Sequence, residues 1–178
     1  MPAQPLEYYS YEDYKCWDGD WELIGGIAYA MAPSPAGRHQ WLVSCIIKEL
    51  MDNLEDCEQC IVLSDTDWII SDDTVVRPDI SVLCEKVENY IVKRPEIIFE
   101  VISPRTARRD EHIKFEIYEF EKVPYYIMVY PDKLTARVFK LNNNKYEKAG
   151  EFNRETFLFE GLPCEIEVNF NNIFKRFR

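Results

Sequence analysis

Apolar residues recur with a helical period in two segments of the chain. Over 38–55 they lie three and four residues apart, which is the pattern of a helix with one face against a core. The same spacing over 106–122 predicts a second long helix. Ser10, with Asp13 three residues later, predicts a capped short helix at 10–18. The expected buried stripes are Leu42, Cys45, Ile46, Leu50 and Leu54 in the first long helix, and Ile113, Ile117 and Phe120 in the second.

Shorter runs of β-branched and aromatic residues predict strands. The run at 95–102 is apolar on both faces except for one glutamate, which is typical of a strand in the middle of a covered sheet. Gly25-Gly26 predicts the turn of a hairpin over 21–32. Pro78 removes a ladder hydrogen bond, so the strand at 74–84 should have an edge, a bulge or a break there. Further strands are expected at 60–70, 124–130, 134–140, 145–149 and within 155–178, with a Pro/Gly loop at 33–37.

The order of these elements predicts an α/β fold, with a mixed central β-sheet flanked by helices and an N-terminal hairpin. No repeat, low-complexity tract or linker divides the sequence, so we expect a single domain over residues 1–178. The 47% hydrophobic and 14% aromatic content supplies enough apolar area for a core, which excludes an intrinsically disordered protein.

Charge and hydropathy restrict the possible partners. The formal net charge of −11 argues against nucleic-acid binding through a large basic surface. No apolar stretch approaches the roughly 20 residues of a membrane span, and the N-terminus lacks the basic and apolar regions of a signal peptide. We therefore expect a cytoplasmic protein with no membrane partner. Segment 93–114 is the local exception in charge, since its basic residues outnumber its acids; they are Lys93, Arg94, Arg105, Arg108, Arg109 and Lys114.

The six cysteines are expected to be free thiols, because a reducing compartment removes disulfides. Cys57 and Cys60 form a C-x-x-C motif, but the sequence contains no second pair at the spacing of a zinc site. Between metal or redox chemistry and a simple helix-to-strand turn, we favour the turn. Cys45 and Cys84 lie in apolar runs and are expected to behave as small buried hydrophobic residues.

Two acidic residues are the most informative candidates for a site. Glu100 interrupts the most apolar strand, where an ionised carboxylate is costly unless it is paired or binds a cation. It is therefore either half of a structural salt bridge or a metal ligand or catalytic acid. Asp79 follows Pro78, where a strand separates from its neighbour. Adjacent strands would bring Asp79 and Glu100 together at a site suited to Mg²⁺ or Mn²⁺, which prefer oxygen ligands.

Other candidates lie on the helices and the hairpin. Asp110, Lys114 and Tyr118 share one face of the second long helix. Lys114 is either in a surface ion pair with Asp110 or directs its ammonium group at a scissile phosphate. Glu22 lies in an apolar part of the N-terminal hairpin, and His39 begins the first long helix, where capping, core packing and catalysis are all open.

Six motifs follow one another along the chain: W-E-L-I-G-G-I at 21–27, A-P-S-P-x-x-x-H at 32–39, R-P-D-I-S-V at 77–82, F-E-V-I-S-P at 99–104, D-x-x-x-K-x-x-x-Y at 110–118 and V-P-Y-Y-I-M-V at 123–129. Together they resemble the Uma-two family of restriction-endonuclease-like proteins, part of the PD-(D/E)xK nuclease superfamily. The resemblance extends from about residue 8 to the C-terminus. It implies a restriction-endonuclease-like core, with a four-stranded mixed sheet between helices, and metal-dependent cleavage of DNA.

The resemblance also implies roles for individual residues. By position, Asp79 matches the aspartate of the PD motif, Glu100 the acidic residue of (D/E)xK, and Glu22 a third acid. The lysine two residues after the glutamate is replaced by Ile102. The resemblance therefore implies that Lys114, on the following helix, supplies the ammonium group.

The function that follows is a Mg²⁺- or Mn²⁺-dependent endonuclease with DNA as substrate, acting alone or as a homodimer. Two alternatives stay open: a catalytically inactive nucleic-acid-binding or regulatory module on the same fold, and a metal-dependent hydrolase of a small phosphoester. In the endonuclease hypothesis, the metal ligands are Asp79, Glu100, Glu22 and the carbonyl of Val101. The residues that contact phosphates are Lys93, Arg94, Arg105, Arg108 and Arg109. The accessory residues are His39, Asp110 and Tyr118.

Overall fold

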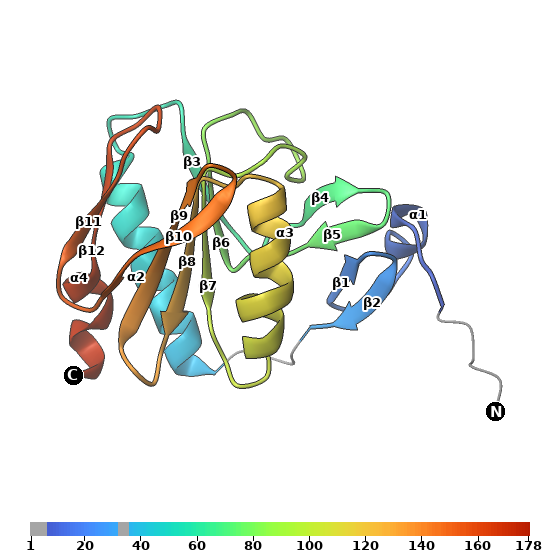
Figure 1. Ribbon diagram of the computed structural model, residues 1–178, viewed down its shortest axis with the longest axis horizontal. Coiled ribbons are helices and arrows are strands. Elements are labelled where there is room, and N and C mark those ends of the chain that lie inside the picture. The colour runs from blue at the N-terminus through green and yellow to red at the C-terminus, as the bar shows by residue number, and fades with distance from the viewer. Residues whose placement is uncertain (1–6, 32–35) are drawn as a thin grey trace.

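A six-stranded mixed sheet forms the centre of the molecule (Figure 1), which we describe from a computed structural model over residues 7–31 and 36–178. The strand order is β10-β9-β8-β7-β6-β3. Strands β7 and β8 run parallel and the other neighbouring pairs are antiparallel, which confirms the predicted mixed sheet but with six strands rather than four. The strands are β3 (Ile61–Ser64), β6 (Ile80–Leu83), β7 (Ile97–Val101), β8 (Tyr125–Tyr130), β9 (Thr135–Asn142) and β10 (Lys145–Phe152).

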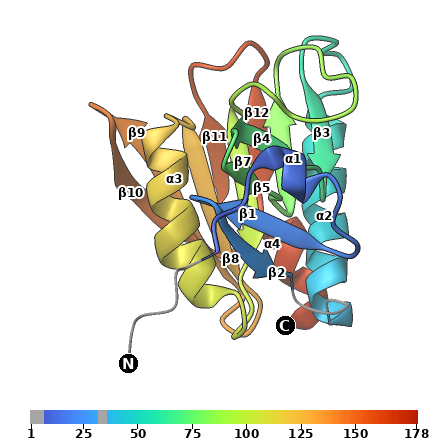
Figure 2. The ribbon, with the colours of Figure 1, turned by 90° about the vertical axis from the view of Figure 1, so that its right-hand side faces the viewer.

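The two long helices cover opposite faces of this sheet, as Figure 2 shows. Helix α2 (Gly37–Asn53) packs on one face, as predicted, and buries Leu42, Val43, Ile46 and Leu50. Cys45 and Leu54, also expected in its stripe, are only half-buried. The second helix covers the other face and runs through a π-helical segment, η1 (Arg109–Lys114), into α3 (Phe115–Phe120).

The predicted stripe of the second helix is wrong. Phe120 is 81% exposed, and Ile113 and Ile117 are only half-buried. The face that turns to the sheet instead carries Asp110, Lys114 and Tyr118. A π-helical turn holds more residues than an α-helical one, so it rotates the following side chains relative to the expected spacing.

A smaller sheet lies beside the central one and contains the N-terminal hairpin (Figure 1). Gly25 and Gly26 both have positive φ in its turn, as predicted, because glycine tolerates this conformation. Ser10 and Asp13 form the predicted capping box of α1 (Tyr11–Tyr14). The sheet order is β2-β1-β5-β4, with β1 (Trp21–Ile24), β2 (Ile27–Ala30), β4 (Trp68–Ser71) and β5 (Thr74–Val76).

The chain passes between the central sheet and the smaller sheet twice, within the two strands predicted at 60–70 and 74–84. The run 60–70 is divided into β3 and β4 near Asp65, which has a φ of 46°. The run 74–84 is divided into β5 and β6 around Pro78, as predicted. Asp79 therefore lies where the chain enters the central sheet, next to the hairpin that carries Glu22.

The C-terminal part adds a two-stranded sheet, β11 (Thr156–Phe159) and β12 (Ile166–Asn169), followed by α4 (Phe170–Phe174) and η2 (Lys175–Phe177). This part packs on the α2 side of the core. The β9–β10 hairpin turns at Asn143 and Asn144, both at positive φ. No helix in the described ranges is long and apolar enough to cross a membrane. The predicted loop at 33–37 lies mostly outside those ranges.

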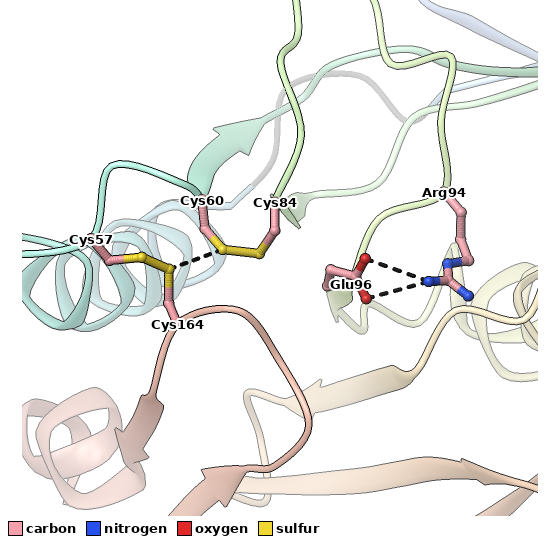
Figure 3. The surroundings of a disulfide bond; sticks show 6 residues. All are labelled: Cys57, Cys60, Cys84, Arg94, Glu96 and Cys164. Atoms are coloured by element: carbon pink, nitrogen blue, oxygen red, sulfur yellow. Dashed lines mark hydrogen bonds and ion pairs between the residues drawn. A yellow bond between two sulfur atoms is a disulfide. The ribbon is translucent and has the colours of Figure 1, made fainter.

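The cysteines depart from the prediction. The structure pairs Cys57 with Cys164 and Cys60 with Cys84 as disulfides (Figure 3), whereas the sequence predicted free thiols. The C-x-x-C motif does lie in a helix-to-strand turn, between α2 and β3, as predicted, but Cys57 and Cys60 each have a disulfide partner. The fold supplies partners that the spacing in the sequence did not reveal, because Cys84 and Cys164 come from distant segments.

Candidate active site

Asp79 and Glu100 meet at one end of the central sheet. Strands β6 and β7 are antiparallel neighbours in which Ile80 lies opposite Phe99, so Asp79 lies beside Glu100. The backbone amide of Asp79 donates to Glu100 Oε2 at 3.3 Å, and the amide of Val101 donates to Asp79 Oδ2 at 2.7 Å. The two carboxylates are thus held next to each other by the backbone of the opposite strand.

Lys114 lies among three carboxylates. Its Nζ is 2.8 Å from Glu22 Oε1, 2.9 Å from Glu100 Oε1 and 3.7 Å from Asp110 Oδ1. The relative exposures of Glu22, Glu100, Asp110 and Lys114 are only 1%, 2%, 4% and 3%. The surface ion pair considered for Lys114 is therefore excluded, because this lysine is buried with three acidic partners.

Both carboxylate oxygens of Glu22 are occupied by donors from the protein. Oε1 accepts from the amide of Arg77 at 2.9 Å as well as contacting Lys114. Oε2 accepts from Arg109 Nη1 at 2.8 Å. The predicted third metal ligand is therefore engaged with cations from the second helix.

The accessory candidates also reach the site. Tyr118 donates its hydroxyl to Glu100 Oε1 at 2.9 Å. His39, in the first turn of α2, places Nε2 3.3 Å from Asp79 Oδ2. Its Nδ1 is buried and has no hydrogen-bond partner among the described residues. The structure thus gathers His39, Asp110 and Tyr118 around the two central carboxylates.

The protonation of the cluster follows from its burial. Burial raises the pKa of Glu100 well above its usual range, and the nearby Asp79, Asp110 and Glu22 charges add to this against the opposing charge of Lys114. Burial likewise raises the pKa of Asp110. For Lys114, burial works against the charge, but Glu100, Glu22 and Asp110 outweigh it and raise the pKa well above the usual value. Lys114 is therefore protonated at neutral pH.

Glu22 behaves in the opposite way from Glu100. Burial opposes its charge, but the Lys114 ammonium and the hydrogen bonds from Lys114, Arg77 and Arg109 lower its pKa below the usual value. Glu22 is therefore ionised at neutral pH. Two buried glutamates on one lysine thus have pKa values shifted in opposite directions, a feature that is frequent in catalytic sites.

The site encloses a small cavity of about 50 Å³. This volume accommodates a small cation with a water molecule, since one water needs only about 10–15 Å³ of such space. Asp79 Oδ1 accepts no hydrogen bond from any described residue, so it is available as a ligand. An oxygen-rich donor set of this kind fits Mg²⁺ or Mn²⁺. The lining includes Glu22, Met31, His39, Arg77, Asp79, Glu100, Val101, Thr106, Arg109, Asp110 and Lys114.

The structure does not bring the five predicted phosphate-binding residues together. Lys93 and Arg94 precede the amino end of β7, where they pair with Glu85 and Glu96. Residues 105–109 follow the opposite end of β7, close to the acidic cluster. Of these, Arg109 reaches Glu22 and packs over Tyr29, whereas Arg105 and Arg108 are exposed.

Arg77 is a site residue that the sequence reasoning missed. Its backbone oxygen accepts from Lys114 Nζ at 3.3 Å. Its side chain donates to Asp67 and Asp20, each at 2.7 Å. Its position directly before Pro78-Asp79 was the only available signal, since the backbone contacts depend on the pairing of the two sheets.

Comparison with known proteins agrees with this fold. The sequence profile of the Uma2 family, described as "Putative restriction endonuclease", matches residues 7–171. A crystal structure described as a putative nuclease belonging to DUF820, from Anabaena variabilis ATCC 29413, superimposes with a TM-score of 0.76 at 15% identity; the match covers 93% of this chain and 97% of that chain. No curated protein sequence matches. The extent of the profile match shows that this chain belongs to the Uma2 family of restriction-endonuclease-like proteins.

Proposed function

We propose that the protein is a Mg²⁺- or Mn²⁺-dependent endonuclease that hydrolyses DNA phosphodiester bonds. The observation that carries this proposal is the contact of the Lys114 ammonium with Glu100, 2.9 Å away, in a cavity that Asp79 also lines. They would serve as the two acids and the lysine of the PD-(D/E)xK pattern that the sequence resembles, with the lysine supplied by the following helix. Family membership supports the nuclease class.

Asp79, Glu100 and the carbonyl of Val101 would hold the cation. Bound there, Mg²⁺ or Mn²⁺ would polarise the scissile phosphoryl group and lower the pKa of a bound water. The high pKa of Glu100 supports this assignment, because a cation would stabilise its ionised form beside the other carboxylates.

Lys114 would stabilise negative charge that develops on the phosphate in the transition state. Because its ammonium group already contacts Glu22 and Glu100, little reorganisation is needed for it to act. Glu22, with both oxygens engaged, fits a positioning residue for Lys114 better than a third ligand. Its replacement by Gln should therefore weaken cleavage through Lys114 while metal binding persists.

Arg105 and Arg108 would contact the DNA backbone near the cavity, since both are exposed and follow the strand that carries Glu100. Replacing either by Ala should reduce the slope of log binding constant against log salt concentration by about the amount expected for one phosphate contact. Lys93→Ala is the matched control, because Lys93 lies beyond the other end of β7.

We place the protein's action in the cytoplasm, where its DNA substrate would be. A homodimer would supply one active site for each strand of a duplex. Light scattering with and without a DNA duplex measures this, and a monomer in both conditions would exclude the dimer.

The deciding experiment is cleavage of plasmid DNA with Mg²⁺ and with Mn²⁺. Wild type should cut, Glu100→Ala should not, and Lys114→Met should be slower by about 10²-fold or more. Glu147→Ala, on the exposed edge strand β10, is the matched acidic control and should cut normally. Wild-type protein that is folded but inactive with both metals would refute the proposal.

A non-catalytic module is the alternative that a specific observation favours. Lys114 and Arg109 neutralise Glu22 without any metal, so the cluster is partly compensated in the protein itself. Such a module would bind DNA without cutting it. A chromogenic phosphodiester included in the same assay would detect the third possibility, a hydrolase of small phosphoesters.

A further inference from the structure

The sulfur atoms of four cysteines converge at the end of β6 opposite to the active site (Figure 3). Cys60 directly precedes β3 and Cys84 directly follows β6, so they face each other across the paired strands. Cys57 lies in the turn after α2, and Cys164 lies between β11 and β12. Three separate segments therefore supply the four sulfurs: the turn at 57–60, the end of β6 and the β11–β12 connection.

The two disulfide pairs are not independent of each other. The Sγ atoms of Cys60 and Cys164, one from each pair, lie 3.1 Å apart. The Sγ atoms of Cys57, Cys60 and Cys164 all lie within 4.8 Å of one another, and Cys84 is bonded to Cys60. Two cross-links need no such proximity, whereas a tetrahedral site made of four sulfur ligands requires it.

A cluster made only of cysteine sulfurs indicates which metal it would bind. Thiolates are soft ligands that favour Zn²⁺ over the hard cations expected at Asp79 and Glu100. The C-x-x-C spacing of Cys57 and Cys60 falls within the range of structural zinc sites. Four protein ligands also leave no open position for a substrate, which is typical of structural rather than catalytic zinc.

We propose that, in the reduced chain, Cys57, Cys60, Cys84 and Cys164 bind one Zn²⁺ as a structural four-thiolate site. The preference for the reduced state rests on the proposed function, because a cytoplasmic enzyme works where thiols stay reduced. Reduction by a dithiol converts the two disulfides into four thiols and leaves two molecules of oxidised dithiol. Zn²⁺ then replaces the four thiol protons, which are released to solvent.

Such a site would fasten the C-terminal hairpin to the central sheet. Cys60 and Cys164 are buried in the core cluster formed on the α2 side. The four sulfurs together link the turn between α2 and β3, the end of strand β6 and the β11–β12 hairpin, and the paired cysteines are as far as 107 residues apart. Zinc there would stabilise the fold without contacting the substrate.

The test begins with the full chain reduced by dithiothreitol, freed of metal with a chelator and reconstituted with Zn²⁺ or Co²⁺. Elemental analysis after gel filtration should give about one Zn²⁺ per chain. The Co²⁺ form should show the intense visible absorption of a tetrahedral thiolate site, and chelation should lower the melting temperature. Cys84→Ser and Cys164→Ser should lose the thiolate spectrum, whereas Cys45→Ser, at a free cysteine, should keep it.

Two controls separate this proposal from others. Glu100→Ala should lose cleavage yet keep its zinc, so failure of the nuclease proposal leaves this measurement valid. A reduced wild-type chain that binds neither Zn²⁺ nor Co²⁺ through sulfur would overturn the proposal. The four cysteines would then serve only as two disulfide cross-links. Retention of the spectrum in Cys84→Ser and Cys164→Ser would also overturn it.

Discussion

The two helices that cover the central sheet differ in what they bury. Helix α2 packs with the apolar side chains of Leu42, Val43, Ile46 and Leu50. The helix formed by η1 and α3 buries Asp110, Lys114 and Tyr118 instead. One face of the sheet is therefore covered by an apolar core, whereas the other combines an apolar core with a cluster of buried charges.

The two faces of the sheet therefore contribute differently to stability and to the chemistry of the site. Apolar packing is non-directional, so the buried leucines, valine and isoleucine of α2 stabilise the fold without orienting a reactive group. Buried charges are costly unless each has a well-placed partner. The second helix thus replaces part of its apolar contact with buried charge, and its Lys114 is held between Glu22 of β1 and Glu100 of β7.

Lys114→Met should have the largest effect on stability. It leaves Glu22, Glu100 and Asp110 without their shared cation, and breaking a buried ion pair costs about 3–5 kcal/mol of unfolding free energy. Urea denaturation measures this loss. Adding Glu22→Gln to Lys114→Met should cost less than the sum of the single changes. Additive effects would show that the two side chains do not interact.

Leu50→Ala, on the other helix, should cost about 3 kcal/mol of unfolding free energy through the cavity it creates. Leu50 is fully buried, so its loss should leave the cleavage rate of the folded protein unchanged. The neighbouring Met51, 59% exposed, gives the control, and Met51→Ala should change stability by less than about 0.5 kcal/mol. Reduced cleavage in the folded Leu50→Ala protein would show that the α2 face also positions the site.

The sequence predicted the α2 face better than the opposite one. An apolar stripe at helical spacing is visible in the sequence itself, and this is why Leu42, Ile46 and Leu50 were identified correctly. On the second helix, the same reasoning selected Phe120, because a buried polar face looks like a solvated one. The π-helical turn that orients Lys114 has no sequence signature that the apolar pattern could provide.

Long-range pairing explains what else the sequence concealed. Asp79 and Glu100 could be paired from the sequence because each lies at a strand, and the two strands are neighbours in the sheet. The convergence of Cys84 and Cys164 with the C-x-x-C motif depends on the C-terminal hairpin, which no local pattern places. Arg109 was assigned to a phosphate-binding surface, and only the position of the N-terminal hairpin shows its contact with Glu22.

Only the polar face should respond to hard cations. Saturating Mg²⁺ or Mn²⁺ should raise the melting temperature. At a metal concentration 100 times the dissociation constant, the gain in unfolding free energy is about 2.7 kcal/mol. A bound cation relieves the repulsion that contributes to the high pKa of Glu100. Asp79→Asn should remove most of the shift measured by calorimetry. Asp52→Asn, exposed on α2, should keep it, and an unresponsive wild type would argue against a metal site at Asp79.

His39 is the point where α2 contributes to the polar site, and its titration should show the smallest effect. Burial opposes the charge on its ring, but the hydrogen bond and the charge of Asp79, with Asp65 and Asp110, raise its pKa above the usual value. The resulting stabilisation is fully present below the usual histidine pKa and is lost as the pH rises through the raised one. NMR titration of the metal-free protein measures the shift, and Asp79→Asn should reverse it because burial then dominates. His112→Gln assigns the signals, since these are the only two histidines in the chain. A His39 pKa at or below the usual value in the wild type would show that the Asp79 contact is too weak to offset burial, and that α2 takes no electrostatic part in the site.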